Sequence, residues 1–342
     1  MRALLLEDTH KFKMIEKEIP EPEEGQVRIK VLSAAICGSE IHGYHGKHFG
    51  RKAPAVMGHE VCGLVDAYGP NTTGKFPVGS RVVVLPQWSC NECRWCRTGH
   101  PDLCDKRVML GFTKWPGGYQ EYFIIPARLL FPISDVYTNQ QGTLIEPFAV
   151  GIHGIRKAGV KMGDSVLVVG SGAIGLMATL AAKEAGATTI ITTDILDYNL
   201  EKAKQVGATH VFNSRNGSVV DFVKSVTDGI GVDHGILCVA APKLLDDTVQ
   251  AVRKLGNIAI IASYTGPVTF EIEKSQLREQ EIIGCVTYDE EDFRIATSLA
   301  EKVHPRIANF ITHTFPIEKA PEAFELVDKR KEDLVRVAFT FD

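Results

Sequence analysis

The 342-residue sequence contains no continuous apolar run that approaches the roughly 18 residues needed to cross a membrane. It also has no basic stripe, and its formal net charge is −4, so composition gives nucleic-acid binding no support. The first residues, MRALLLEDTHKF, hold a short apolar patch that Glu7 and Asp8 interrupt, which is not typical of a signal peptide. We therefore expect a cytoplasmic protein that binds neither nucleic acid nor a membrane.

The pattern of apolar residues changes midway along the chain, and the length suggests about two domains. The first half is β-rich, with β-branched or aromatic runs at 27–36, 81–86 and 119–126. Further on, predicted strands alternate with helices. The strands are expected at 165–170, 189–194, 210–213, 232–240, 257–263 and 281–288, and the clearest helices at 173–186, 199–207 and 292–303. The prediction is an α/β protein with a β-rich domain and a six-stranded parallel Rossmann domain.

The segment VVGSGAIG (168–175) contains a G-x-G-x-x-G pattern between a predicted strand and a predicted helix. Its glycines permit a tight turn, leave room for a pyrophosphate and let the helix pack against the sheet. An acid at the end of the next strand would bind an adenosine ribose and repel a 2′-phosphate, which favours NAD over NADP. The alternative is a structural turn without a ligand. The candidate cofactor-binding residues are Gly170, Gly172, Ala173, Ile174, Gly175 and Asp194.

Four of the eight cysteines lie within fifteen residues, in CNECRWCRTGHPDLC (90–104). The spacing C-x2-C-x2-C-x7-C can close a tetrahedral thiolate shell around zinc, and four sulfur ligands leave no open position for a substrate. Disulfides or free thiols are the alternatives. We predict a structural zinc site at Cys90, Cys93, Cys96 and Cys104.

A second set of residues has the composition of an open zinc site. CGSEIH (37–42) supplies Cys37, GHEVCG (58–63) supplies His59 and Glu60, and LIEPFAVGIHG (144–154) supplies Glu146. A thiolate, an imidazole and a carboxylate with a water molecule form the arrangement of a catalytic zinc. Spacing alone does not show that these distant residues meet.

These motifs, in this order, resemble the zinc-containing medium-chain alcohol and polyol dehydrogenases over essentially the whole chain. The signature G-H-E-x2-G-x5-G stands at Gly58, His59, Glu60, Gly63 and Gly69. Within that family, EPFAVGIHG is most similar to the sorbitol dehydrogenase branch. The resemblance implies a GroES-like catalytic domain (1–150), a Rossmann domain (151–288) and a C-terminal segment (289–342) that returns to the catalytic domain.

The resemblance also implies the roles of individual residues. Cys37 and His59 would bind the catalytic zinc, with Glu60 and Glu146 as acidic partners, either of which would contact the metal directly or through water. Ser39 and His42 match the family's proton relay, and Glu146 offers a second proton path. A strand at PVTFEIE (267–273) would pair with its counterpart in a second subunit, so a homodimer or homotetramer is expected.

The sequence departs from the family pattern at two positions. Glu40 replaces an Asp, and Thr287 stands where sorbitol dehydrogenases are expected to have an Arg near the substrate. The implied reaction is therefore NAD-dependent oxidation of a secondary alcohol in a polyol, a sugar acid or a related small polyhydroxy substrate, or the reverse reduction, with two zinc ions per subunit.

Other activities stay open at this point. They are a threonine- or butanediol-type dehydrogenase, an NAD-assisted elimination or epimerisation at the same site, a metal-free reductase and a protein without catalytic activity on a dehydrogenase fold.

Overall fold

The computed structural model describes residues 1–264, 266–330 and 333–341. The chain forms two compact units. The first comprises Met1–Glu146 together with Ala296–Asp342, and the second comprises Pro147–Ile295. Helices α4 (Ile145–Ala158) and α10 (Glu290–Ile307) continue from one unit into the other.

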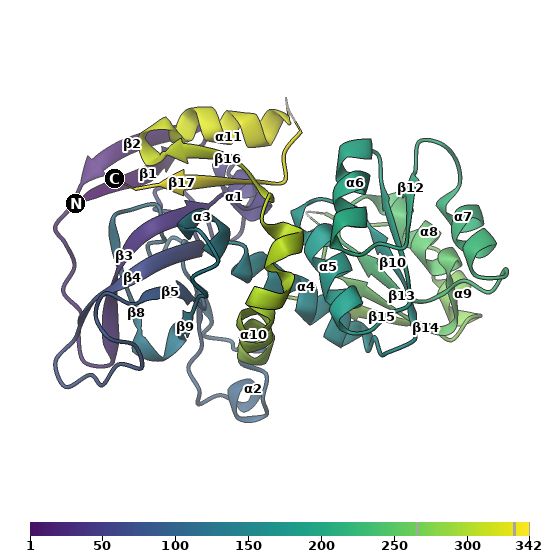
Figure 1. Ribbon diagram of the computed structural model, residues 1–342, viewed down its shortest axis with the longest axis horizontal. Coiled ribbons are helices and arrows are strands. Elements are labelled where there is room, and N and C mark those ends of the chain that lie inside the picture. The colour runs from purple at the N-terminus through teal and green to yellow at the C-terminus, as the bar shows by residue number, and fades with distance from the viewer. Residues whose placement is uncertain (265, 331–332, 342) are drawn as a thin grey trace. The chain divides into compact units, whose positions relative to one another are not determined.

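The first unit is built on a seven-stranded sheet in the order β16–β17–β3–β4–β5–β9, with β8 also paired to β3 (Figure 1). Its strands are β3 (Gln26–Ala35), β4 (Glu60–Tyr68), β5 (Arg81–Val84), β8 (Tyr122–Pro126), β9 (Leu130–Pro132), β16 (Ile311–Pro316) and β17 (Arg336–Thr340). Strand β17 runs antiparallel to β3, with Ala338 opposite Ala35. The last strand of the chain therefore joins the sheet formed by the N-terminal half.

Short elements surround this sheet. Strand β1 (Arg2–Asp8) pairs with β2 (Lys11–Glu16), and β6 (Gln87–Trp88) pairs with β7 (Val108–Met109). The helices are α1 (Gly38–Tyr44), α2 (Arg94–Arg97), α3 (Asn139–Gly142), α11 (Ala320–Lys329) and the 3-10 turns η1 (Pro101–Leu103), η2 (Ala127–Leu129) and η3 (Ile317–Lys319).

The second unit holds a six-stranded parallel sheet in the order β12–β11–β10–β13–β14–β15. Its strands are β10 (Ser165–Val169), β11 (Thr189–Asp194), β12 (His210–Asn213), β13 (Val232–Leu237), β14 (Val252–Ile260) and β15 (Glu281–Gly284). This is the 3-2-1-4-5-6 order of a Rossmann fold, whose strand order reverses between β10 and β13. Ligands bind at the carboxyl ends of the strands at such a reversal.

Helices cover both faces of the parallel sheet, with α5 and α6 on one side and α7 and α8 on the other (Figure 1). Their bounds, with that of the short α9, are α5 (Ala173–Glu184), α6 (Asp197–Val206), α7 (Val219–Val226), α8 (Pro242–Ala251) and α9 (Ile272–Gln276). The strands supply buried Val, Ile and Leu to the core, among them Leu167, Ile191 and Ile258. A sheet buried on both faces needs such continuously apolar strands.

The fold confirms the α/β class and the six parallel strands, and the strand expected at 267–273 for pairing with a second subunit stays a prediction except at its end. Of the segment 267–273, residues 267–271 pair with no strand in the described part of the chain, and Ile272 begins α9. The alternation of apolar and polar residues in PVTFEIE suits a strand, and the hydrogen-bonded neighbour that such a strand needs was expected from a second subunit.

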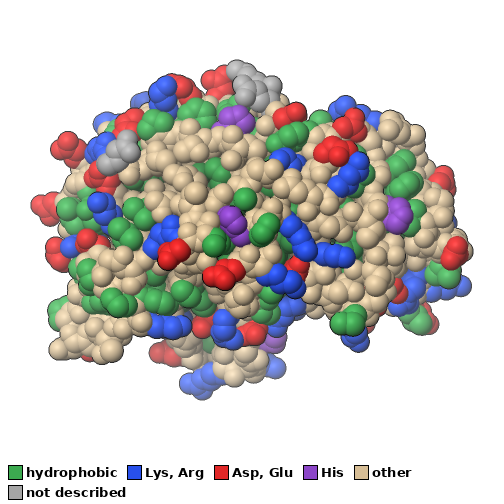
Figure 2. All heavy atoms as spheres, in the orientation of Figure 1, with side chains coloured by type: hydrophobic (Ala, Val, Ile, Leu, Met, Phe, Trp, Pro, Cys, Tyr) green, Lys and Arg blue, Asp and Glu red, His purple; other side chains and the backbone are tan. Residues whose placement is uncertain are grey.

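Two surface observations complete the description. Among the described residues, no helix combines the length and the hydrophobicity required to span a bilayer. On the face shown in Figure 2, acidic and basic side chains are interspersed rather than gathered by sign.

Candidate active site

Three of the residues predicted to hold a metal lie together in the first unit. The Sγ atom of Cys37, a ring nitrogen of His59 and a carboxylate oxygen of Glu60 lie within 4.8 Å of one another. Cys37 precedes α1, His59 immediately precedes β4, and Glu60 is the first residue of β4. Gly58 places them there, because its φ of +99° suits glycine and an added Cβ would lie 2.6 Å from the ring of Tyr119.

Glu40 contacts two of these candidate ligands, Cys37 and His59, through its carboxylate, a role that the sequence did not indicate. Its Oε2 accepts hydrogen bonds from the Cys37 amide (2.9 Å) and the Tyr119 hydroxyl (2.6 Å). Its Oε1 accepts one from the Gly58 amide (2.9 Å) and lies 2.8 Å from Nδ1 of His59. Burial alone would raise the pKa of Glu40, but the charge and hydrogen bonds of its neighbours, His59 above all, hold that pKa at about 2. An ionised Glu40 at Nδ1 leaves Nε2 of His59 free for a metal.

Glu146 lies beside the other ring nitrogen of the same imidazole. Its Oε1 atom is 3.9 Å from Nε2 of His59, and the side chain is buried in the first turn of α4. The structure therefore brings Cys37, His59, Glu60 and Glu146 together, although the sequence could not show that they meet.

Glu60 is paired with an arginine from the end of the chain. Nη2 of Arg336 lies 2.9 Å from Oε1 of Glu60, and both side chains are buried. Burial raises the pKa of Glu60 well above its usual range, against the opposing charge of Arg336. Although Arg336 is close, neither carboxylate oxygen accepts a well-aligned hydrogen bond from the described residues. A buried carboxylate with unused acceptors, beside a thiol and an imidazole, fits a bound cation.

The surroundings of the Cys37 thiol favour its ionised form. Burial would raise its pKa, but the hydrogen bond and charge of His59, with the charge of Arg336, bring that pKa to about 6. A thiolate is the form that binds a metal.

Ser39 and His42 stand three residues apart on α1, so they share one face of that helix. Both side chains are half-buried. Their role as a proton relay stays a prediction.

The four cysteines of residues 90–104 form a second cluster, distinct from the first. Cys93 Sγ lies 3.5 Å from Cys96 Sγ, Cys104 Sγ lies 3.5 Å from Cys90 Sγ, and Cys90 Sγ lies 4.0 Å from Cys96 Sγ. Zinc–sulfur bonds of about 2.3 Å in a tetrahedron place the sulfur atoms about 3.8 Å apart. These separations fit a four-thiolate zinc shell and are far longer than the roughly 2.05 Å of a disulfide.

Backbone amides support this cluster. The Cys93 amide donates to the Cys90 sulfur, and such backbone hydrogen bonds, from Glu92 and Cys93, lower the pKa of Cys90 to about 6. Only α2 and η1 are helical in the lobe formed by residues 90–104, so a bound metal would cross-link a segment with little regular structure.

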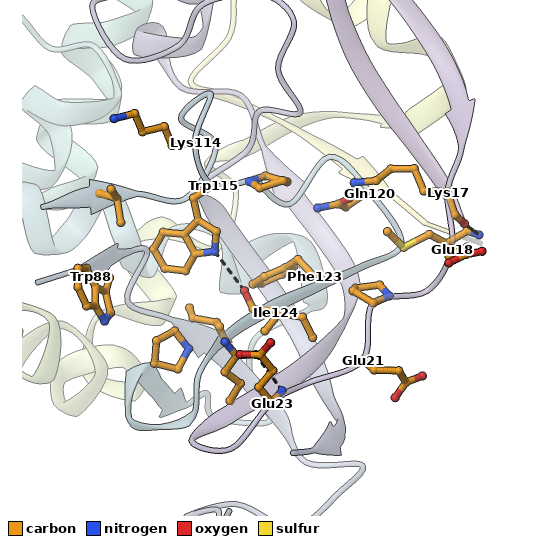
Figure 3. A pocket seen from close by; sticks show the side chains of 17 residues that line it. Lys17, Glu18, Glu21, Glu23, Trp88, Lys114, Trp115, Gln120, Phe123 and Ile124 are labelled. Atoms are coloured by element: carbon orange, nitrogen blue, oxygen red, sulfur yellow. Dashed lines mark hydrogen bonds between the residues drawn. The ribbon is translucent and has the colours of Figure 1, made fainter. Parts of the chain in front are cut away.

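The first unit also contains a cavity of about 510 Å³, with Trp88, Trp115 and Phe123 among its lining residues. Aromatic side chains form one part of the cavity's lining (Figure 3). There the indole N–H of Trp115 donates a hydrogen bond to the carbonyl of Ile124. None of its lining residues belongs to either cluster, so we do not assign it to the reaction.

The glycine-rich turn has the predicted geometry in the second unit. Gly170 adopts φ +91°, and a Cβ at Gly175 would lie 1.7 Å from the carbonyl oxygen of Gly170. Gly172 precedes α5 without a capping side chain, and a Cβ there would meet nothing within 4 Å. The turn, with Ala173 and Ile174 as the first helical residues, presents free amides and open space at the sheet's reversal point, which suits a phosphate.

Asp194 stands at the end of β11 and holds the turn. Its Oδ2 accepts from the Ser171 amide (2.7 Å) and Asn199 Nδ2 (3.2 Å), and its Oδ1 accepts from the amides of Ile195 and Leu196. Four hydrogen bonds fill the acceptor capacity of a carboxylate. A ribose would therefore displace at least one of them, most easily the long one from Asn199.

A third group of possible ligands, His153 with Asp289 and Asp292, is already satisfied within the protein. His153 Nδ1 lies 2.7 Å from Asp292 Oδ2, and Arg156 Nη1 lies 2.5 Å from Asp292 Oδ1. The two aspartates also accept each other's amides at the start of α10. Because a guanidinium already balances the charge of Asp292, we read this group as a helix cap and an ion pair.

Thr287, the second departure from the family pattern, lies between β15 and α10 with φ +49°. A β-branched residue rarely adopts this left-handed conformation.

Comparison with known proteins agrees with both units. Residues 23–135 match the model of the alcohol dehydrogenase GroES-like domain, and residues 173–302 match that of the zinc-binding dehydrogenases. A sorbitol dehydrogenase of Bacillus subtilis is 30% identical over 345 residues, covering 98% of this chain and 96% of the relative.

The chain belongs to the zinc-binding medium-chain dehydrogenase family.

Two further relatives bear on its chemistry. An L-threonine 3-dehydrogenase of Pyrococcus horikoshii is 32% identical over 320 residues, covering 92% of this chain and 91% of that protein. The crystal structure of an Escherichia coli CFT073 protein described as the alcohol dehydrogenase rspB, complexed with NADH, has a TM-score of 0.90 and 30% identity, covering 100% and 99% of the two chains. This dehydrogenase is thus a zinc-dependent, NAD-binding enzyme of the alcohol and polyol type, with a four-cysteine structural zinc site and a Cys–His–Glu catalytic site.

Proposed function

We propose that this dehydrogenase oxidises a secondary alcohol of a polyol, a sugar acid or a related polyhydroxy compound with NAD, or catalyses the reverse reduction. The observation that carries the proposal is the carboxylate of Glu146 at 3.9 Å from Nε2 of His59. A site of one thiolate, one imidazole and carboxylates leaves a position for a substrate oxygen, which the four-cysteine cluster does not.

Each residue of the site has a stated role in this proposal. Cys37, His59 and one of the two carboxylates, Glu60 or Glu146, would hold zinc, which would supply Lewis-acid polarisation of the substrate oxygen at the fourth position. Ser39 and His42 accept the hydroxyl proton and pass it towards solvent, and Glu146 offers a second path.

The glycine-rich turn holds the hydride acceptor. The amides at Gly172, Ala173 and Ile174 bind the pyrophosphate, Gly170 and Gly175 shape the turn, and Asp194 accepts the ribose hydroxyls. A carboxylate at Asp194 repels a 2′-phosphate, so NAD is preferred to NADP. Asp194→Ala should reduce the ratio of kcat/KM with NAD to that with NADP, and an unchanged ratio would contradict this assignment.

The test of the reaction is a screen of polyols, sugar acids and vicinal diols with NAD on zinc-replete protein, followed by NADH absorbance. Cys37→Ser and His59→Ala should abolish turnover and retain NADH binding, because neither residue belongs to the nucleotide turn. Cys285→Ser, in the second unit and outside both clusters, is the matched control. Full activity in either ligand variant would refute the site.

A second candidate is a threonine- or butanediol-type dehydrogenase, which the 32% identity to a threonine dehydrogenase supports. The same screen separates the two when it includes L-threonine and 2,3-butanediol. Product formation without net NADH would instead indicate NAD-assisted elimination or epimerisation.

We also propose that the protein forms a homodimer or homotetramer in the cytoplasm. β15 is an edge strand with Ile282 36% exposed, and Ile272 and Leu277 nearby in sequence are 66% and 73% exposed. An apolar sheet edge favours pairing with another chain, and light scattering during size-exclusion chromatography measures the resulting mass. None of the eight cysteines forms a disulfide, which suits a reducing compartment.

A further inference from the structure

A buried arginine lies against the candidate metal ligand His59 and has no role in the reaction described above. Arg51 is 3% exposed. Its Nη2 lies 2.9 Å from Nδ1 of His59, and its Nη1 lies 3.2 Å from Nε2 of His48. Its guanidinium carbon lies 4.9 Å from the ring centroid of Phe112. The Arg51 side chain therefore contacts both the candidate metal ligand His59 and the ring of Phe112.

Two glycines, Gly43 and Gly50, leave the space that Arg51 and Phe112 occupy. A Cβ at Gly43 of α1 would lie 2.9 Å from the Cβ of Arg51, and one at Gly50 would lie 2.5 Å from the ring of Phe112. The amide of Arg51 donates to Nδ1 of His48 at 3.1 Å. The position of Arg51 is thus fixed by the hydrogen bond from its amide to His48 and by its close approach to Gly43 of α1.

Nδ1 of His59 has two partners with opposite requirements. Glu40, 2.8 Å away, can only accept a hydrogen bond, whereas Arg51, 2.9 Å away, can only donate one. A neutral imidazole carries one ring proton. Glu40 therefore favours the tautomer with a bare Nε2, which can bind a metal, and Arg51 favours the tautomer with its proton on Nε2, which cannot.

We propose that Arg51 is a positioning residue that opposes Glu40 at Nδ1 of His59, and so limits how tightly the Cys37–His59–Glu60 cluster holds its cation. A guanidinium keeps its charge when buried, so Arg51 offsets the negative charge of Glu40 behind the ligand. A carboxylate behind a metal-binding imidazole raises the ring's basicity, and changing such a partner alters metal affinity about 10–100-fold. By opposing Glu40, Arg51 keeps His59 a weaker electron donor, which preserves the Lewis acidity of the cation.

This inference rests on the cation site of the proposed function, and zinc retention tests it without a substrate. Holoprotein is equilibrated with graded concentrations of a zinc chelator, and the zinc remaining per chain is measured. Arg51→Met removes the charge and the donors, and should tighten retention at the Cys37 site about 10-fold or more. Arg51→Lys, which keeps the charge without the planar fork, should have a smaller effect. The four-cysteine site of the same chain is the internal reference and should not change.

Two further variants sharpen the experiment. Glu40→Gln should loosen zinc at the Cys37 site, in the opposite direction to Arg51→Met. Arg28→Met is the matched control, because Arg28 also lies over an aromatic ring, 5.9 Å from the centroid of Tyr122, and pairs with Asp66 away from the cluster. It should change neither site.

Unchanged or weaker retention in Arg51→Met overturns the proposal. If that variant does not fold, weaker retention in Arg51→Lys, or unchanged retention in Glu40→Gln, overturns it equally. In cobalt-substituted protein, a shift of the thiolate-to-cobalt absorption band in Arg51→Met gives a second readout, which packing alone would not move. Altered retention in a protein that oxidises no alcohol would refute the proposed function alone, whereas turnover without altered retention would refute this inference alone.

Discussion

The guanidinium of Arg336 lies 2.9 Å from the carboxylate of Glu60, which joins the first residue of β17 to the first residue of β4. Both side chains are at most 5% exposed. The last strand of the chain thereby supplies a positive charge to a cluster that holds a thiol, an imidazole and carboxylates. The C-terminal segment is thus part of the candidate site as well as part of the sheet.

Arg336→Met should destabilise the protein most strongly when zinc is absent. Removing one partner of a buried ion pair costs about 3–5 kcal/mol, because Glu60 would then lie buried without the charge that faces it. Zinc at Glu60 would offset part of that cost, so the loss of unfolding free energy in urea should be larger in chelator-treated protein. Glu60→Gln combined with Arg336→Met should recover part of the stability, and an equal loss with and without zinc would contradict the assignment.

Cys93→Ser should remove one zinc ion and destabilise the lobe at residues 90–104. Its sulfur lies 3.5 Å from that of Cys96, and the lobe has few other cross-links. Zinc content should fall from two ions per chain to one, with a lower melting temperature and unchanged NADH affinity, since the second unit has its own core. Cys285→Ser is the control. Wild-type zinc content and melting temperature in Cys93→Ser would argue against a structural site.

Two glycines of the same turn should respond differently to alanine. At Gly175 a Cβ would lie 1.7 Å from a carbonyl oxygen, so Gly175→Ala should lower both the melting temperature and NADH affinity. At Gly172 the space is open, so Gly172→Ala should fold normally and bind NADH more weakly, because the methyl group occupies the place of the pyrophosphate. Calorimetry and NADH fluorescence measure the two effects. Unimpaired NADH binding by Gly172→Ala would place the cofactor elsewhere.

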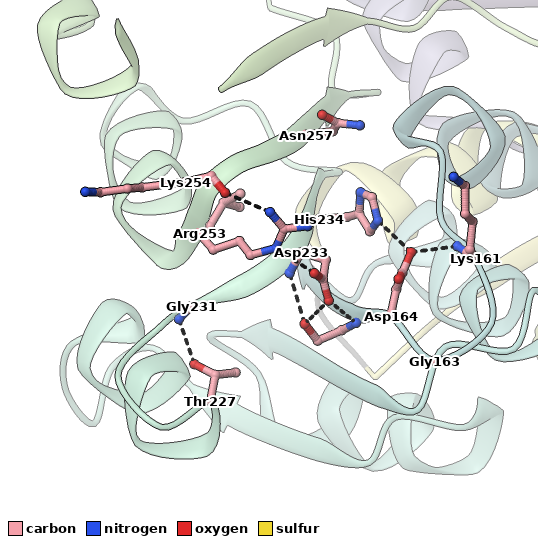
Figure 4. Close-up of polar contacts among 12 residues, drawn as sticks. Lys161, Gly163, Asp164, Thr227, Gly231, Asp233, His234, Arg253, Lys254 and Asn257 are labelled. Carbon is pink, nitrogen blue, oxygen red and sulfur yellow. Dashed lines mark hydrogen bonds and ion pairs between the residues drawn. The ribbon is translucent and has the colours of Figure 1, made fainter. Parts of the chain in front are cut away.

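Asp233 should stabilise the second unit at neutral pH and lose that effect in acid. It accepts hydrogen bonds from the amide and hydroxyl of Ser165 (2.7 and 2.6 Å) and lies 2.6 Å from Nε of Arg253 (Figure 4). Burial would raise its pKa, but these partners lower it to about 2 from an ordinary 3.8. Folding therefore favours the ionised form, and the stabilisation disappears as the pH falls from about 4 towards 2.

The comparison variant is Asp233→Asn. Its deficit in unfolding free energy should be constant above about pH 5 and should shrink below about pH 4. Glu281→Gln changes an exposed carboxylate of the same sheet and should show little deficit. A deficit in Asp233→Asn that is independent of pH between 2 and 6 would show that the charge of Asp233 has no part in stability.

Local patterns explain why much of the fold was predictable. The strand at 165–170, the glycine turn and the following helix are adjacent in sequence, and β10, Gly170 to Gly175 and α5 appear where expected. The four cysteines are also close in sequence, so their spacing alone indicated a closed shell. Gly207, predicted to end a helix, follows α6 with φ +114°, as the left-handed end of a helix requires.

The remaining features depend on contacts that no local pattern encodes. Glu40 was visible only as a departure from the family's Asp, and its contact with His59 requires α1 to pack beside the start of β4. Arg51 and Arg336 have no motif, because their effect comes from the buried charges they approach. The strand predicted at 267–273 depends on a neighbouring strand from a second subunit, which the alternation of its residues does not supply.

Zinc stoichiometry on purified, catalytically active protein measures directly whether an open cation site exists beside the closed one. Elemental analysis should give two zinc ions per chain in the wild type and one in Cys37→Ser, with the ion that remains held by the four cysteines. Active wild-type protein with a single divalent cation, retained in full by Cys37→Ser, would contradict a catalytic metal at Cys37 and His59.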